Sequence, residues 1–526
     1  MNAATKTGKA SSKAGSKAPA GAKEPVRAQR RKSVGFLDET FRDGPQSLWA
    51  TRIKTESLLG AMDMMRRAGF QKACVCSGAT FEAAVKFMRD DPWERLRLTR
   101  LYMPDVALDV LMRSRNLFGW SRYPDEVVEM LFRTLQKNGA DWIKVFDGLN
   151  DINQIAAHFR IGKALGIRMS GVLTYSISPI HTDAYFAKKA QDLLDCGVDS
   201  ITLVDASGIL TAEHARTLLA AVMGVTRGRV PIEFYAHHSM GLAHESYREA
   251  LRAGVDTVTT ASEPLANGDS LPSTLDIARI AEELGIASGL DHDALLRLDD
   301  YFTWVAYAEN KPVGQRMSFD PIRYERFLRH QIPGGMMSNF QNQLRELGLF
   351  HRLDEVLEEA GRVRAELGYP IMVTPFSQFV GVQATFNVIQ GERYKNVPRE
   401  LLLYAQGHYG SSGAPIDPNV LDRILAGRHR EDVEHEAAFG AGVLKEFERE
   451  HGPFKSDEQR LMHLFYGKEH VEALEREKST FEERPSVRQP LRVLVEDLAR
   501  QGTLRTFKLE KGSLRLSMAF AAPGGN

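Results

Sequence analysis

The 526-residue sequence lacks several features that would place it in a specialised class of proteins. It has three cysteines, Cys74, Cys76 and Cys196, which are too few for a disulfide framework and fit reduced, buried thiols. Lysine plus arginine and aspartate plus glutamate each number 68, so the net charge points to neither a nucleic-acid nor a membrane partner. No apolar run reaches the roughly 18 residues that span a bilayer. These absences predict a cytoplasmic globular protein.

The first segment, residues 1–32, lacks the apolar stretch of a secretory signal. It consists mainly of Ala, Gly, Ser, Lys and Arg, and Glu24 is its one acidic residue. Such a composition does not bury enough apolar surface to fold. We therefore expect a disordered basic tail, with a transit peptide as the open alternative.

From about Val34 to Gly289, short apolar runs alternate with amphipathic stretches. Runs of this length predict buried parallel strands, at residues 34–38, 71–77, 106–112, 142–147, 168–176, 200–208, 231–238 and 257–263. Helical stretches such as 54–68, 124–138, 183–196 and 212–225 lie between them, and Gly69, Gly139 and Gly197 are typical helix stops. Eight strand–helix units predict an α/β fold closed as a (β/α)₈ TIM barrel. A doubly wound open sheet is the alternative, although no G-x-G-x-x-G follows a strand.

The remainder of the sequence predicts a mainly helical domain and a charged C-terminal region. Its last unit combines a helix at 491–501 with alternating residues 504–519, which predict a hairpin that turns at Lys511-Gly512. The predicted division is therefore a basic tail (1–32), a barrel (33–290), a helical domain (291–450) and a C-terminal region (451–526).

Polar side chains gather where the predicted strands end, and in a closed barrel these ends share one mouth. The candidates are Arg42, Asp43 and Gln46, then Glu82, Arg113, Asn116, Trp120, Asp147 and Asp205, and finally His237 and His238. A carboxylate after the first strand and imidazoles after the seventh can share Zn²⁺, Mn²⁺ or Mg²⁺. Such an ion would polarise a substrate carbonyl and stabilise an enolate, while Arg42 and Arg113 would bind a carboxylate or the enolate oxygen.

Six runs resemble the carboxyltransferase component of biotin-dependent enzymes, the family of pyruvate carboxylase, the oxaloacetate decarboxylase α subunit and the transcarboxylase 5S subunit. They are TFRDGPQSLWATR (40–52), SGATFEAAVKFMRDDPWERLR (77–97), LMRSRNLFGWSRYPDEVV (111–128), KVFDGLND (144–151), RHQIPGGMMSNFQNQ (329–343) and VTPFSQFVG (373–381). DPWERLR and HQIPGG are typical of the biotin-dependent branch of the hydroxymethylglutaryl-CoA-lyase-like barrels. The resemblance covers roughly residues 34 to 420.

This resemblance implies roles for individual residues. Asp43 corresponds to a metal ligand, and Arg42, Gln46 and Arg113 to residues that bind a keto acid or its enolate. Thr374 corresponds to a threonine that passes a proton between substrate and biotin, because a hydroxyl both donates and accepts. We expect Arg42 and Thr374 to be catalytic, and the strand-end residues Glu82 and Asp147 to bind substrate with Gln46 and Arg113. The implied reaction moves a carboxyl group from carboxybiotin to the enolate of pyruvate or a related 2-oxo acid or acyl acceptor.

Several positions depart from the family pattern, most of all at the metal. Val204 stands where the family has a carbamylated lysine ligand, and Tyr235 stands where it has the first histidine of His-x-His. Asp43 and His237 remain, and Tyr235, His238 and Asp205 are additional candidate ligands. Trp120, Pro45 and Gln378 replace a tyrosine, a histidine and a lysine.

No Ala-Met-Lys-Met biotinylation run and no ATP-grasp carboxylase occur in the sequence. Biotin is therefore expected on a separate subunit, with a biotin carboxyl carrier protein and a biotin carboxylase subunit as partners, and family precedent suggests a homodimer or larger complex. Residues 491–518 resemble the segment before the biotinyl domain in free-standing carrier subunits, which suggests a docking or assembly element.

Two other functions stay open at this point. A non-catalytic carboxyltransferase-like subunit with an assembly role would account for the lost ligands. A metal-dependent aldolase or lyase barrel would account for the Ala-His-His-Ser run at 236–239. The leading hypothesis is a carboxyltransferase subunit, whose acceptor the sequence does not identify.

Overall fold

The structure is a computed structural model that describes residues 32–332, 337, 341, 344–346, 348–426, 440, 442–477, 498, 505–511 and 514–519. The predictions of a basic tail, of the Pro-Gly-Gly part of the HQIPGG run and of a helix at 491–501 fall almost wholly outside these residues.

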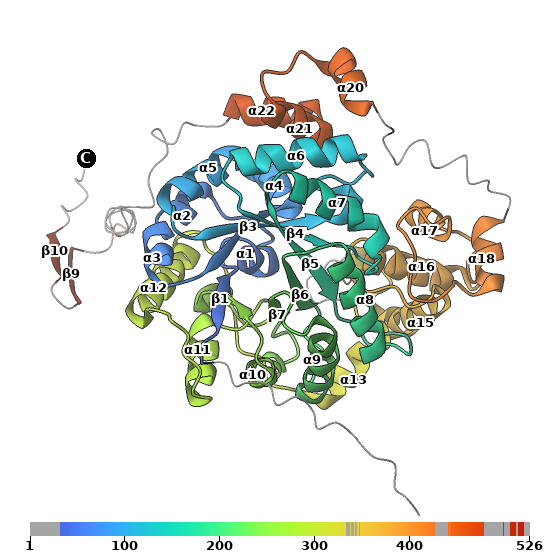
Figure 1. Ribbon diagram of the computed structural model, residues 1–526, viewed down its shortest axis with the longest axis horizontal. Helices are drawn as coiled ribbons and strands as arrows, with labels where there is room; N and C mark the ends of the chain where they lie inside the picture. Colours follow the sequence, from blue (N-terminus) through green and yellow to red (C-terminus); the bar gives the residue numbers. More distant parts are fainter. Residues whose placement is uncertain are drawn as a thin grey trace, which may run out of the picture.

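Eight parallel strands form a closed barrel in chain order (Figure 1). The strands are β1 Gly35–Asp38, β2 Lys72–Ser77, β3 Ala107–Arg113, β4 Trp142–Phe146, β5 Arg168–Thr174, β6 Ser200–Asp205, β7 Ile232–Ala236 and β8 Thr257–Thr260. Closure is made by β1 and β8, which pair from Gly35↔Thr257 to Asp38↔Thr260. The predicted TIM barrel is confirmed and the open-sheet alternative is wrong. Every strand starts within one residue of its predicted start, but β5 to β8 end two or three residues before their predicted ends.

Helices surround the barrel on its outer side, except the short α1, which lies at the mouth (Figure 1). They are α1 Asp43–Leu48, α2 Thr55–Leu59, α3 Met62–Arg67, α4 Gly78–Ala83, α5 Pro92–Tyr102, α6 Asp125–Lys137, α7 Ile152–Ala164, α8 Asp183–Asp195, α9 Ala212–Thr226, α10 Ala243–Ala253, α11 Thr274–Glu283, α12 His292–Ala308 and α13 Pro321–His330, with short turns η1 Ala84–Met88, η2 Ser114–Asn116 and η3 Glu263–Leu265. The predicted helix at 54–68 is two helices, α2 and α3. Among the described residues, no helix has the length and apolar character needed to cross a membrane.

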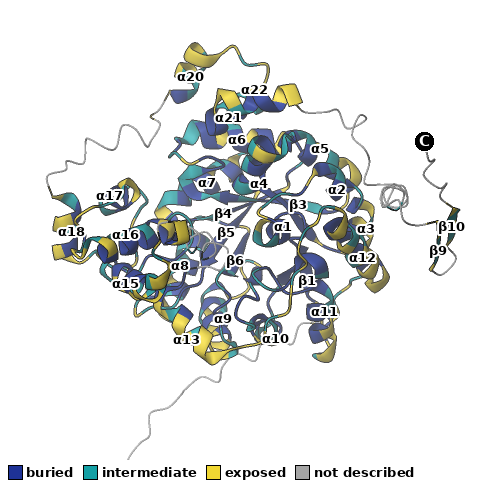
Figure 2. Cartoon of the chain, turned by 180° about the vertical axis from the view of Figure 1, so that it is seen from behind, coloured by how far each residue is buried: buried dark blue, intermediate teal, exposed yellow. Residues whose placement is uncertain are grey.

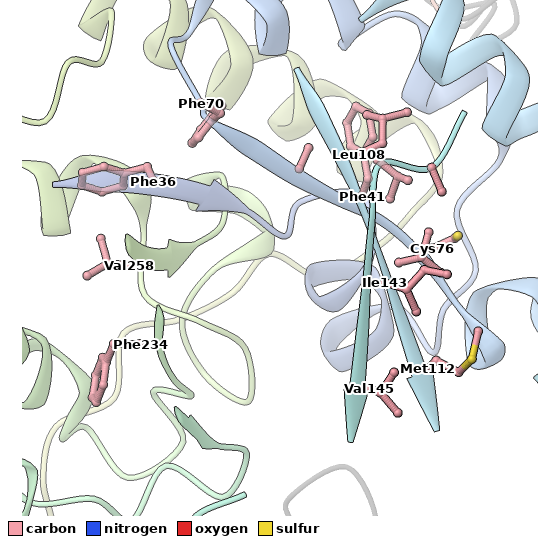
Figure 3. Close-up of a cluster of buried hydrophobic side chains, with 14 of the residues drawn as sticks. Phe36, Phe41, Phe70, Cys76, Leu108, Met112, Ile143, Val145, Phe234 and Val258 are labelled. Carbon is pink, nitrogen blue, oxygen red and sulfur yellow. The ribbon is translucent and has the colours of Figure 1, made fainter. Parts of the chain in front are cut away.

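The hydrophobic core lies between the strands and these helices, so buried residues concentrate in the centre while helices such as α13 and α20 are largely exposed (Figure 2). Outward-facing strand residues such as Phe36, Leu108, Ile143, Phe234 and Val258 are fully buried (Figure 3). This is the expected result of near-continuous apolar strands covered by helices.

The interior of the barrel, in contrast, contains paired charges. Lys144 of β4 forms ion pairs with Asp109 of β3 at 3.0 Å and with Glu233 of β7 at 3.4 Å. Lys72 of β2 also pairs with Glu233, which accepts a hydrogen bond from Thr202 at 2.9 Å. Burial alone would raise the pKa of Glu233, but the two lysines outweigh it and lower the pKa to about 2. Charges thus occupy space that branched apolar side chains usually fill.

A second hydrophobic core belongs to the helical region beyond α13. Its helices are α15 Leu353–Glu366, α16 Phe376–Gln390, α17 Arg399–Ala405 and α18 Pro418–Leu425, with the short turn η4 Phe350–Arg352. Leu149, in the loop after β4, also packs in this core. Because of this contact, the helical region is anchored beside the barrel mouth.

Three later helices return to the barrel: α20 Val443–His451, α21 Asp457–Tyr466 and α22 Lys468–Glu477 (Figure 1). The ring of Phe465 lies 5.1 Å from that of Tyr123 and 6.4 Å from that of Phe118, centroid to centroid. The Tyr123 hydroxyl donates to the Leu464 carbonyl at 3.4 Å. These helices therefore complete the core of the barrel and not that of the helical region.

Truncating Phe465 to alanine is expected to lower the free energy of unfolding by about 3–5 kcal/mol, because it removes a buried ring between the barrel and α21. Urea denaturation measures the change. Phe350→Ala is the matched control: its ring is 41% exposed, so its effect should stay near 0.5 kcal/mol or less. An equal decrease in the free energy of unfolding in the two variants would contradict the packing of α21 on the barrel.

The predicted C-terminal hairpin is present as β9 Thr506–Lys511 and β10 Leu514–Ala519, which pair antiparallel. Leu509 faces Leu516 and Phe507 faces Met518 in this register. Residues 512–513 of the turn lie outside the described residues. The hairpin thus has one face of cross-strand apolar pairs.

Candidate active site

A cavity of about 400 Å³ opens at the C-terminal ends of the barrel strands. Strand ends and loops of the barrel supply most of its wall, and Val373 and Thr374, from the loop before α16, supply the rest. The candidate residues that line it are Arg42, Asp43, Gln46, Glu82, Arg113, Trp120, Tyr235, His237 and Thr374. The structure therefore brings together residues more than 300 positions apart in the sequence, because the helical region packs beside the mouth of the closed barrel.

A buried hydrogen-bonded cluster forms the wall beside β1 and β7. Arg42 donates from Nε to Glu39 at 2.7 Å and from Nη1 to Asp43 Oδ1 at 2.9 Å. His237 Nε2 lies 3.0 Å from Asp43 Oδ2 and 2.8 Å from the Tyr235 hydroxyl. Both carboxylate oxygens of Asp43 are thus bound by neighbouring side chains.

The charges of this cluster follow from its burial and its ion pairs. Burial alone would raise the pKa of Asp43, but His237 and Arg42 hold it well below its usual range. Burial would lower the pKa of His237, but Asp43 raises it above the ordinary value. Burial and the charge of Asp43 raise the pKa of the Tyr235 phenol well above its usual range. Asp43 is therefore an anion and Tyr235 a neutral hydroxyl at neutral pH.

These donors do not fit a divalent metal ion. Valine has no ligating atom, so Val204 supplies nothing where the resemblance implies a lysine. The Tyr235 hydroxyl already bonds His237 Nε2, and the Arg42 guanidinium holds an oxygen of Asp43 that a metal would need. Over the part of the chain that the structure describes, no three His, Cys, Asp or Glu side chains are grouped to hold a metal ion. Asp43 and His237 are two ligands, fewer than the three of typical catalytic zinc sites.

The other two candidate ligands have different surroundings. The ring of His238 packs edge-on against His244 with 4.5 Å between centroids, and burial lowers the pKa of His238 to about 4. Asp205 accepts a hydrogen bond from the backbone N–H of Leu210 at 2.7 Å. Neither side chain is among the residues that line the cavity. Each of them makes these contacts with the loop that follows its own strand or with the helix after that loop.

The opposite wall of the cavity carries Arg113. Its guanidinium lies over the Trp120 ring, 4.6 Å from the centroid, and the Trp120 indole N–H donates to Glu82 at 3.1 Å. Glu82 also accepts from Lys86 at 2.7 Å. Among the described residues, Arg113 forms no direct ion pair with a carboxylate, so its planar guanidinium is available for a substrate carboxylate.

Asp147, which we expect to bind substrate, lies outside the main cavity and organises the loop after β4. Its carboxylate accepts hydrogen bonds from the backbone N–H groups of Leu149 at 2.9 Å and Asp151 at 3.0 Å, and from the Ser114 hydroxyl at 2.8 Å. It lines a smaller neighbouring cavity, which Arg113 and Thr374 also border. Burial raises the pKa of Asp147 to about 6.

Sequence reasoning missed three charged residues that line the main cavity, Glu39, Lys144 and Asp269. Lys144 could have been recognised, because a lysine within an apolar strand needs a buried partner. Glu39 gave a weaker signal, since an acidic residue after a strand is common in ordinary turns.

The site thus lies in a closed parallel barrel with two arginines, Arg42 and Arg113, at its mouth and a threonine loop contributed by the helical region that follows. A family model described as a conserved carboxylase domain matches residues 327–516. The chain is 38% identical over 395 residues to a pyruvate carboxylase subunit of Methanocaldococcus jannaschii, covering 74% of this chain and 68% of that protein. It is 36% identical over 396 residues to the methylmalonyl-CoA carboxyltransferase 5S subunit of Propionibacterium freudenreichii subsp. shermanii, covering 75% and 77%.

Among solved structures, the carboxyl transferase domain of Rhizobium etli pyruvate carboxylase, with pyruvate and biocytin, superposes with a TM-score of 0.77. It is 26% identical, and the match covers 85% of this chain and 78% of that one. The chain belongs to the family of carboxyltransferase components of biotin-dependent carboxylases. It is an enzyme of this type, and the aldolase and non-catalytic alternatives are not favoured.

Proposed function

We propose that the chain transfers a carboxyl group between carboxybiotin, carried by another chain, and the carbon next to the carbonyl of pyruvate or a related 2-oxo acid. The observation that carries this proposal is the placement of Arg42, Arg113 and Thr374 around one cavity. Arg113 is available for the carboxylate of the acid, and Arg42 lines the same cavity. The volume of about 400 Å³ suits a small ligand.

The reaction proceeds in three steps within this cavity. The N–CO₂ bond of carboxybiotin breaks and releases CO₂, which leaves the electron pair on the ureido group. A proton then leaves the carbon next to the substrate carbonyl, passes through the Thr374 hydroxyl and reaches the biotin nitrogen. The resulting enolate carbon forms a bond to CO₂, which gives a 2-oxo dicarboxylate and biotin.

The partners in this proposal are a biotin carboxyl carrier protein and a biotin carboxylase subunit. Both relatives described above carry the names of subunits, which supports an assembly of several chains. The β9–β10 hairpin, with its apolar face, is the proposed docking element. We also propose a homodimer or larger complex. For the domain division we propose a boundary near residue 330 and not 290, because α12 and α13 pack in the barrel core, as do α20 to α22. A divalent ion is not included, because the donors around Asp43 do not fit one.

The proposal is tested by reconstitution. The chain is mixed with biotinylated carrier protein, biotin carboxylase, ATP and bicarbonate, and carboxylated product is measured for a panel of 2-oxo acids. Product that depends on bicarbonate and on all three proteins is the expected result. An absence of product with every 2-oxo acid in the panel would refute the proposed function.

Replacing Arg113 by glutamine is expected to raise KM for the 2-oxo acid by about 10- to 100-fold, because a charge-assisted bond to the carboxylate contributes about 1.5–3 kcal/mol. Arg133→Gln, a change on the exposed face of α6, serves as the matched control and should leave KM unaltered. A normal KM in Arg113→Gln would remove Arg113 from the binding site.

A further inference from the structure

The cluster around Asp43 contains hydrogen-bond donors at the place where a metal ion is expected. Arg42 is 4% exposed and Tyr235 is 5% exposed, yet both line the cavity. The Arg42 guanidinium carbon lies 6.0 Å from the centroid of the Tyr235 ring. The two side chains thus face the same part of the cavity from β7 and from the loop after β1.

We propose that Arg42 and Tyr235 together stabilise the enolate oxygen of the substrate, and that this carboxyltransferase works without a divalent metal ion. The proposal rests on the proposed function, because it concerns the enolate formed there. It assigns Tyr235 as a catalytic residue that donates a hydrogen bond from its phenol. Arg42 supplies the positive charge.

The geometry leaves Arg42 able to do this. Its Nε and Nη1 are held by Glu39 and Asp43, whereas Nη2 makes no hydrogen bond within the described part of the chain. The two bonds fix the plane of the guanidinium, so the remaining donors are oriented before the substrate arrives. Preorganised donors aimed at developing negative charge are among the largest contributions to catalysis.

Tyr235 is held in the same way. Its hydroxyl lies 2.8 Å from His237 Nε2, and the ring packs with Ala261, Ala266 and Leu271 in a small apolar cluster. The apolar side chain of Val204 packs against this cluster, where a charged ligand would otherwise stand. The apolar surroundings therefore favour a neutral hydrogen-bond donor over a charged metal ligand at this position.

The test measures metal content and the binding of oxamate, an isostere of the pyruvate enolate, and it needs no turnover. After incubation with Zn²⁺, Mn²⁺ and Mg²⁺ followed by desalting, the full chain is expected to retain less than about 0.1 equivalent of each ion by mass spectrometry. Calorimetry is expected to give the same oxamate affinity with and without EDTA. Retention of about one equivalent, with loss of oxamate binding in EDTA, would overturn the proposal.

Two variants address Tyr235 itself. Tyr235→Phe removes only the hydroxyl and is expected to weaken oxamate binding in EDTA by about 10- to 100-fold, as loss of a hydrogen bond to a charged group predicts. Tyr235→His adds a third nitrogen or oxygen donor beside Asp43 and His237 and is expected to raise the retained metal toward one equivalent. Unchanged affinity in Tyr235→Phe, or no oxamate binding by the wild-type chain under any condition, would overturn the proposal. Failure of carboxyl transfer in the reconstituted assay is a separate result that refutes the proposed function alone.

Discussion

Replacing Thr374 by alanine is expected to lower kcat for carboxyl transfer by about 10²- to 10⁴-fold, the usual contribution of a positioned acid–base group. Thr374 is the cavity residue whose hydroxyl both accepts a proton from carbon and donates one to nitrogen in the proposed reaction. Thr374→Ser keeps the hydroxyl and should retain most of the activity. The measurement is product formation in the reconstituted assay at saturating 2-oxo acid.

The control for this variant comes from the same helical region. Thr385 donates to the Gly381 carbonyl inside α16 at 2.9 Å, so Thr385→Ala should leave kcat unchanged. Oxamate binding should also remain within about twofold of wild type in Thr374→Ala, because the change removes a proton carrier and not a binding group. Wild-type kcat in Thr374→Ala would show that the proton takes another route.

Replacing Glu233 by glutamine is expected to lower the free energy of unfolding by about 3–5 kcal/mol, the usual result of removing one partner of a buried ion pair. The change leaves Lys72 without its partner carboxylate and Lys144 with Asp109 alone. Glu129→Gln makes the same chemical change on the surface of α6, where the pair with Arg133 is exposed, and should cost about 0.5 kcal/mol or less. Urea denaturation at pH 7 measures both.

The carboxylate of Glu233 also makes the free energy of unfolding of the barrel depend on pH, with lower stability in acid. The pKa of Glu233 is lowered to about 2 in the folded protein and is about 4.3 in an unfolded chain. The full contribution of Glu233 to the free energy of unfolding is therefore present above pH of about 4.3. It is lost as the pH falls toward 2. Between these values, the difference in unfolding free energy between wild type and Glu233→Gln should shrink. A constant difference across this range would contradict the ion pairing of Glu233.

Much of the fold could be predicted because strand length, apolar character and glycine stops are local signals. Strand ends also predicted the side of the barrel on which Arg42, Arg113 and His237 meet. The direction in which each side chain points was harder to predict. Asp147 turns to backbone N–H groups of its own loop, and Arg42 binds the adjacent Asp43, because local hydrogen bonds compete with the cavity for each polar group.

The return of α21 to the barrel was beyond sequence reasoning for a different reason. Its residues have an ordinary amphipathic pattern. Such a pattern indicates that one face of the helix is buried, but it does not identify the element on which that face packs. Only the three-dimensional structure shows that Phe465 packs on Phe118 and Tyr123. The same applies to Lys144, whose partners Asp109 and Glu233 come from strands that are distant in sequence.

The contact between Tyr123 and Leu464 joins residues 341 positions apart, and this has a consequence for synthesis of the chain. A ribosome that adds about 5–20 residues per second takes roughly 20–70 s to cover that interval. During this time the aromatic surface around Phe118 and Tyr123 is made but has no α21 to cover it. The nascent barrel therefore exposes an uncovered aromatic patch beside its mouth for most of translation.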